Sequence, residues 1–248
     1  MRGCVRIRVE RRGEQSVLVA CDGHIPLAPR RIPAPIGWAR VTLVQAVAGL
    51  LSGDEVEIEV EVGEGAALEL IGNAATLVYP ARRPASQIVR CSVGTGGRFA
   101  WLPQPLVLAA GCDFRGSLQL DLAPDAVAVV RETVVLGRYG EVSGRCDATF
   151  RCDLAGTPLL RDRVCIDETS RRSPVELGGA AVYTSLALLG ARPAVRPRHD
   201  ELDLAGPGRL LRSLARDAAE AELRTRPVED RFLAELATVP SGAPRLAG

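Results

Sequence analysis

The stretch GDEVEIEVEVGEGAALELIGNAATLVY, residues 53–79, decides the expected fold class of this chain. From Glu55 to Val62, glutamates alternate strictly with valine or isoleucine. This two-residue period is typical of a β-strand with one buried and one solvated face. A glycine-rich turn at Gly63–Gly65 follows, and then a second apolar run at Ala67–Ile71. The pattern predicts a hairpin of two strands.

Similar runs recur along the chain between glycines and prolines. The expected strands lie near Val5–Glu10, Ser16–Cys21, Val56–Val62, Ala67–Ile71, Ile88–Ser92, Ser117–Leu122, Ala126–Leu136, Arg145–Leu154, Leu159–Asp167 and Ala181–Leu188. Such spacing favours an all-β fold, mainly antiparallel, arranged as a sandwich or a coil of many strands. No fixed-period repeat is visible, so the sequence does not predict a regular solenoid.

The C-terminal fifth has a different pattern. Apolar residues follow helical spacing over 210–221, Pro227 interrupts them, and a second apolar face follows over 232–236. We therefore expect one β-rich domain over residues 1–238, with two short C-terminal α-helices from about residue 207. Residues 239–248 are expected to form a flexible tail.

Composition excludes several classes of protein. The 248 residues carry 31 basic and 30 acidic side chains, a net charge of +1, whereas nucleic-acid and membrane-surface binders show a basic excess. The seven cysteines form no CxxC pair, which argues against zinc-finger and thioredoxin-like sites. The opening MRGCVRIRVERR lacks an apolar signal core, and the run Val41–Leu51 is too short to cross a bilayer. We expect a cytoplasmic protein with reduced thiols.

Motifs for catalysis are missing from the sequence. It contains no GxSxG, GxxxxGK[ST] or HExxH segment. The glycine-rich segment Ser92–Phe99 lacks the lysine of a phosphate loop and is interpreted as a hairpin turn. The two histidines, His24 and His199, lie in proline-rich surroundings that indicate surface loops. Because catalytic transition-metal sites usually recruit two or three histidines, we expect neither a stable metal site nor an enzyme.

Two groups of acidic residues have more than one interpretation. The glutamates of residues 55–61 would repel one another by about 0.6 kcal/mol per neighbouring pair at roughly 7 Å. They form either a solvated sheet face or an acidic stripe for a basic partner. Glu132 and Asp162 instead share strand faces with apolar residues. Such acids are either paired with arginines or line a polar interior path for a cation.

Five segments together resemble the urease accessory protein D family. They are Gly53-Asp54, Ala74-Ala75-Thr76 with Val78-Tyr79-Pro80, Trp101-Leu102-Pro103-Gln104, Leu136-Gly137-Arg138 with Gly140-Glu141, and Gly156 with Pro158-Leu159-Leu160. Their order and spacing fit the family over about residues 50–170. The chain departs from the family pattern at Leu77, where a basic residue is common, and at Pro105, where an acidic one is.

The resemblance implies a non-catalytic urease maturation factor and chaperone of nitrogen metabolism. It implies a complex with the F and G accessory proteins and apo-urease, and help in nickel insertion, with transient nickel rather than a tightly bound cofactor. The matching positions give nickel-path candidates at Asp54, Thr76, Glu132, Glu141 and Asp162. They also give structural motif residues at Gly53, Tyr79, Trp101, Pro103, Gln104, Gly137 and Arg138. The alternative is a β-rich small-molecule-binding or enzymatic protein with an acidic interior site.

Overall fold

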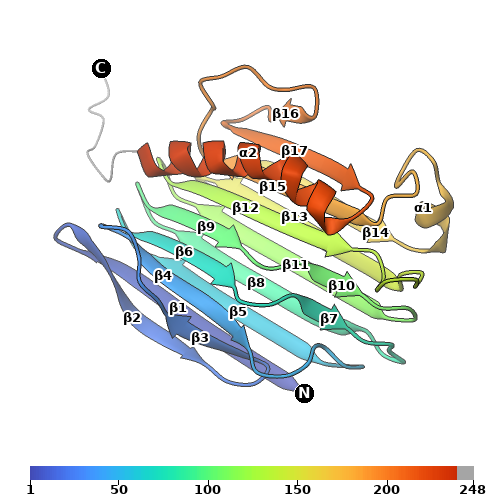
Figure 1. Ribbon diagram of the computed structural model, residues 1–248. Coiled ribbons are helices and arrows are strands. Elements are labelled where there is room, and N and C mark those ends of the chain that lie inside the picture. Colours follow the sequence, from blue (N-terminus) through green and yellow to red (C-terminus); the bar gives the residue numbers. More distant parts are fainter. Residues whose placement is uncertain (239–248) are drawn as a thin grey trace.

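Two β-sheets pack face to face and form the body of the molecule (Figure 1). The computed structural model describes residues 1–238. The seven-stranded sheet has the strand order β14-β13-β11-β8-β5-β1-β2. Its strands are β1 (Arg2–Arg12), β2 (Gln15–Gly23), β5 (Glu55–Val62), β8 (Ala85–Val93), β11 (Asp113–Leu122), β13 (Arg145–Leu154) and β14 (Thr157–Ile166).

The ten-stranded sheet has the main order β16-β17-β15-β12-β9-β6-β4-β3, and the short strands β7 and β10 join it beside β12. Its strands are β3 (Leu27–Arg31), β4 (Ala39–Gln45), β6 (Ala67–Gly72), β7 (Thr76–Val78), β9 (Arg98–Leu102), β10 (Leu106–Leu108), β12 (Val127–Val135), β15 (Val182–Leu189), β16 (Glu201–Asp203) and β17 (Gly208–Ala215). The helices are α1 (Glu168–Arg172) and α2 (Ala218–Thr238).

The middle of the chain winds as a coil that alternates between the sheets. Successive strands of the seven-stranded sheet begin at Glu55, Ala85, Asp113 and Arg145, which are 30, 28 and 32 residues apart. Each of these strands pairs in parallel with the next one. The β-rich class is confirmed, but the expectation of mainly antiparallel pairing is wrong, because both sheets are mixed. The stacking is solenoid-like. The sequence does not reveal the repeat, because the successive coils have similar lengths but do not repeat the same residues.

The predicted hairpin of residues 56–71 is also wrong. The turn at Gly63–Gly65 carries the chain from one sheet to the other, so that β5 lies between β1 and β8 whereas β6 lies between β4 and β9. The glycine-rich segment Ser92–Phe99 makes the equivalent crossing from β8 to β9. The two turns stack, since the Gly65 N–H donates to the Thr95 carbonyl at 2.9 Å. Gly65 and Gly96 both have φ of +62°, which favours glycine.

The main hydrophobic core fills the space between the sheets, and a second core lies on the outer face of the ten-stranded sheet. There, Val228, Phe232 and Leu236 of α2 pack on β9, β12, β15 and β17. Figure 1 shows α2 lying across that face. The acids discussed below lie in four settings: between the sheets, under α2, on the outer face of the seven-stranded sheet and in loops.

The C-terminal prediction needs correction. Residues 208–215 form β17 instead of a helix, because Leu210 faces the core between the sheets while Leu211 faces α2. Residues 1–238 contain two helices, but α1 precedes β15, and α2 is a single helix of 21 residues that continues through Pro227. Packing of both halves of α2 on the sheet outweighs the cost of an internal proline. The predicted tail, residues 239–248, lies outside the described residues.

Candidate functional site

A partly enclosed cavity of about 110 Å³ lies between the two sheets. Its walls are mainly apolar, and Ile58 and Phe150 are among the side chains that line it. Three of the predicted nickel-path residues also line it, namely Thr76 of β7, Glu132 of β12 and Asp162 of β14. A space of this size admits several water molecules. The fold thus brings together three residues that are far apart in the sequence.

Of the two carboxylates that line the cavity, Glu132 is the one without a partner among the described residues. Within residues 1–238 no hydrogen bond or ion pair reaches its side chain. Burial, and secondarily the negative charge of Asp162, raises the pKa of Glu132 to about 7. The carboxyl group therefore exchanges its proton near neutral pH, and when ionised it presents free oxygen atoms to the cavity.

Asp162 is paired, but not with the arginines that lie near it in sequence. Its carboxylate forms an ion pair with Arg212 of β17 and accepts a hydrogen bond from the backbone N–H of Arg163 at 2.9 Å. The Asp162 side chain is 9% exposed and that of Arg212 is 46% exposed. This pair therefore bridges the two sheets at the border between the cavity and solvent.

Three further residues at this border were not predicted from the sequence, namely Tyr183, Ser185 and Arg212. Residues Glu132, Ser185 and Arg212 are register partners on β12, β15 and β17. Tyr183 is buried beside them, and burial raises its pKa to about 12. The sequence carries a signal for Arg212, because Leu210, Arg212 and Leu214 alternate with the period of a strand, but the helical spacing over 210–221 conceals it.

The Trp101–Gln104 segment shapes the cavity wall. Trp101 is buried, and Trp101, Pro103 and Gln104 all line the cavity. A Cβ atom on Gly72 would lie 2.7 Å from the Gln104 backbone nitrogen, so glycine is required for this close approach. Thr76 is held nearby, because its backbone N–H donates to the Pro105 carbonyl at 2.9 Å.

The other two nickel-path candidates lie outside the cavity lining. The Asp54 carboxylate accepts hydrogen bonds from the Met1 ammonium group at 2.6 Å and the Leu51 N–H at 2.8 Å. Glu141 is bound by Arg138, whose hydrogen bonds lower the pKa of this carboxyl to about 2. Both acids stabilise loops, and neither presents a free oxygen to the interior.

Three of the remaining motif residues also lie in these loops. Gly53 has φ of +78° and Gly137 has φ of +103°, conformations that favour glycine. A Cβ atom on Gly137 would lie 2.5 Å from the Glu141 carbonyl oxygen. The Tyr79 N–H donates to the Leu50 carbonyl at 2.9 Å. These contacts explain the residue types by local geometry.

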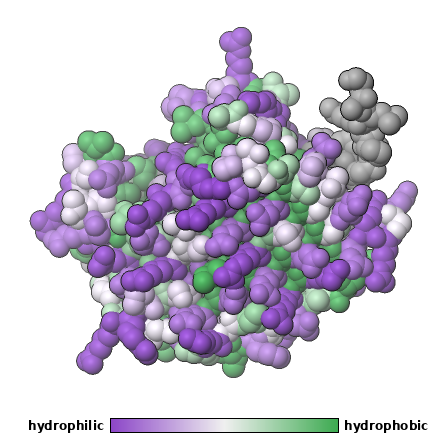
Figure 2. Space-filling view, turned by 180° about the vertical axis from the view of Figure 1, so that it is seen from behind, coloured by the Kyte–Doolittle hydropathy of each residue, from purple (hydrophilic) through white to green (hydrophobic). Residues whose placement is uncertain are grey.

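The glutamates of β5 are neutralised by arginines of neighbouring strands. The pairs are Arg2–Glu55, Arg6–Glu59 and Arg8–Glu61 with β1, and Arg90–Glu57 with β8. Their side chains are 41–54% exposed on the glutamate side. The view from behind in Figure 2 shows a surface dominated by hydrophilic side chains. We call these four pairs the outer ladder. They favour the interpretation as a solvated face.

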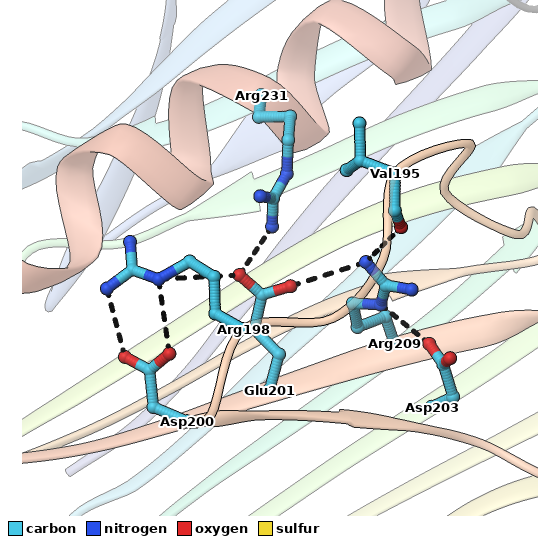
Figure 3. A network of polar contacts seen from close by, with 7 residues as sticks. All are labelled: Val195, Arg198, Asp200, Glu201, Asp203, Arg209 and Arg231. Carbon is cyan, nitrogen blue, oxygen red and sulfur yellow. Dashed lines mark hydrogen bonds and ion pairs between the residues drawn. The ribbon is translucent and has the colours of Figure 1, made fainter.

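A fully buried acid occurs in a third place, beneath α2 (Figure 3). The Glu201 side chain is 0% exposed and pairs with Arg231 of α2 at 2.6 Å and with Arg209 of β17 at 3.4 Å. Arg209 also binds Asp203 at 2.6 Å. Sequence reasoning missed Glu201, because its short strand has no clear alternation. Its network fixes α2 and the 190–207 connection to the sheet.

The described residues, 1–238, offer neither a compact metal-binding cluster nor a membrane-spanning helix. In this range no three His, Cys, Asp or Glu residues cluster closely enough to hold a metal ion. His24 and His199 are exposed in loops. No helix in the described part of the chain has the length and apolar character needed to span a bilayer.

Comparison with known proteins settles the family. The family model described as UreD urease accessory protein matches residues 1–246. The chain belongs to the UreD family of urease accessory proteins. A urease accessory protein UreD 1 of Streptomyces griseus subsp. griseus is 37% identical over 201 residues, which cover 79% of this chain and 79% of the relative. Another UreD 1, from Saccharopolyspora erythraea, is 36% identical over 242 residues, which cover 90% and 92%.

The resemblance stated from the sequence is thus confirmed, and UreD membership supports a role in urease maturation. The family model matches a much longer part of the chain than the 50–170 segment that carries the motifs. The relatives are named accessory proteins, which suggests a role other than catalysis.

Proposed function

We propose that this UreD protein is a non-catalytic scaffold that links apo-urease to the F and G accessory proteins and passes nickel through the cavity between its sheets. The observation that supports this most is the Glu132 carboxyl, which lines the cavity without a hydrogen-bond partner among the described residues. A carboxyl group that faces a mainly apolar cavity without partners costs stability, so its presence there favours a role in binding. The nickel ion is the cargo in this proposal.

The donor set suits a cation that must leave again. Carboxylate and hydroxyl oxygens bind nickel more weakly than a cage of histidines and thiolates. Glu132, Asp162 and Thr76 line the cavity from three separate strands. Successive weak ligands of this kind favour transfer over storage.

The chemistry of the site also supports a non-catalytic role. Cys146 lines the cavity, but burial raises the pKa of its thiol, which disfavours the nucleophilic thiolate. The alternative of a small-molecule site is disfavoured by size, since about 110 Å³ is well below the roughly 300–1,000 Å³ of ordinary ligand pockets.

Partner binding and compartment follow from the same proposal. The charge balance of 31 basic and 30 acidic side chains disfavours nucleic acid or a membrane surface as the partner. We place the protein in the cytoplasm, in complex with the F and G proteins and apo-urease. The predicted single domain over residues 1–238 is retained in this proposal.

The test is co-expression of the tagged chain with its urease subunits and the F and G proteins. We expect all partners to co-purify. Glu132→Gln should lower nickel-dependent urease activity roughly tenfold, the scale on which metal-site partners act, with the complex intact. The matched control is Glu57→Gln in the outer ladder, which should activate urease normally. Failure of the partners to co-purify contradicts the scaffold role, and equal activity of both variants contradicts the cavity route.

A further inference from the structure

The side of the molecule beside the cavity is bordered by two edge strands. β14 is the last strand of the seven-stranded sheet. In the other sheet, β16 pairs with β17 only at residues 209–211, so β17 is the sheet edge at residue 212. The Arg212–Asp162 ion pair joins these edges across the space between the sheets. Asp162 lines the cavity whereas Arg212 lies outside its lining, and we call this side of the cavity the lateral mouth.

Behind the lateral mouth lies a short row of polar side chains. Arg212 is the register partner of Ser185, and Ser185 is the register partner of Glu132. Because neighbouring strands are about 4.8 Å apart, Glu132 lies roughly 10 Å behind Arg212. A small solute that enters by this mouth therefore meets the ion pair first, then Ser185, and then the free carboxyl group.

The two members of the pair differ in burial, and this makes the contact reversible. Asp162 is held in place by the N–H of Arg163 and is 9% exposed, whereas Arg212 is 46% exposed. The guanidinium can thus move into solvent without unpacking the core. When it leaves, a carboxylate lines the opening instead of a cation.

We propose that Arg212 is the gate of the lateral mouth and its charge-selecting residue. With the pair formed, the guanidinium blocks the opening and repels cations. A divalent cation enters by replacing it at Asp162. That nickel is the cation rests on the proposed function, but the gate itself does not.

The gate can be tested without nickel by placing a thiol behind it. Ser185 is buried and lines the cavity, so Ser185→Cys is a conservative probe. The measurement is its rate of reaction with two methanethiosulfonates, one neutral (methyl) and one cationic (2-aminoethyl). Peptide mass spectrometry separates this site from the native cysteines.

We expect Arg212→Gln to accelerate the reaction of the neutral reagent about tenfold, because the open state is no longer suppressed by the ion pair. The cationic reagent should gain more than the neutral one. Arg212→Lys should stay near the parent rate. Asp162→Asn, which removes the other member of the ion pair, should also accelerate labelling. It replaces Arg212→Gln in the test if that variant does not fold.

The control is Arg40→Gln, which removes the half-buried Arg40–Glu69 pair on the outer face of the same sheet. Unchanged labelling in both gate variants, or equal acceleration in the control, would overturn the proposal. Urease activation by the same variants is scored separately. Faster labelling with normal activation keeps the gate and contradicts nickel transit through this mouth.

Discussion

The outer ladder and the cavity contain the same kind of side chain in opposite circumstances. Each ladder glutamate has an arginine on the adjacent strand and remains about half exposed. Glu132 lines the cavity between the sheets and is half-buried, and no described residue offers it a partner. Asp162 is intermediate, since one exposed arginine holds it. Pairing, more than acidity or burial alone, therefore separates acids that stabilise the sheet from acids that are available for binding.

Glu201 provides the strongest test of this distinction, because it is buried and fully paired. Glu201→Ala would leave Arg209, whose side chain is 3% exposed, without one of its acids. We expect a loss of about 3 kcal/mol in the free energy of unfolding. Denaturant titration checks this, and a loss below about 1 kcal/mol would show that burial adds little to this network.

Glu132→Gln should raise the free energy of unfolding at alkaline pH, in contrast to Glu201→Ala, which should lower it. The unfolded chain ionises this carboxyl near pH 4.5, whereas the folded protein keeps its proton up to about pH 7. The wild type therefore loses stability as the pH rises through this window, by up to about 3 kcal/mol. The glutamine variant should be the more stable protein at about pH 8 and no more stable at about pH 4. Thermal unfolding at both pH values measures it, and a pH-independent difference would contradict the account.

Coupling between the two cavity acids should be smaller but measurable. The charge of Asp162 contributes to the raised pKa of Glu132. In an Asp162→Asn background, the pH 8 gain from Glu132→Gln should therefore shrink by about 1 kcal/mol. A double-mutant cycle gives this value directly. Full additivity would mean that the two carboxyl groups do not sense each other.

The outer ladder should show the smallest effect. Glu59→Gln removes one exposed pair with Arg6 and should cost about 0–1 kcal/mol, with the difference reduced at high salt. Chemical denaturation at low and high salt checks this. A cost comparable to that of Glu201→Ala would place the ladder among the main stabilising elements.

Local patterns predicted much of the fold and part of the candidate site. Alternation identified β5 and placed Glu132 and Asp162 on inward faces, as the structure confirms. Pairing partners depend on which strands become neighbours, which local patterns do not encode. Local patterns therefore predict a hairpin at Gly63–Gly65. They also do not reveal Arg212, because it lies 50 residues from the Asp162 that it binds.

The most direct test of the central claim is nickel binding to the purified chain. Isothermal titration at about pH 8, above the pKa of Glu132, would compare wild type, Glu132→Gln and Glu57→Gln. We predict weak binding that Glu132→Gln reduces roughly tenfold and Glu57→Gln leaves unchanged. Equal binding by all three proteins, or a loss confined to Glu57→Gln, would contradict the claim that the unpaired cavity carboxylate is the ligand.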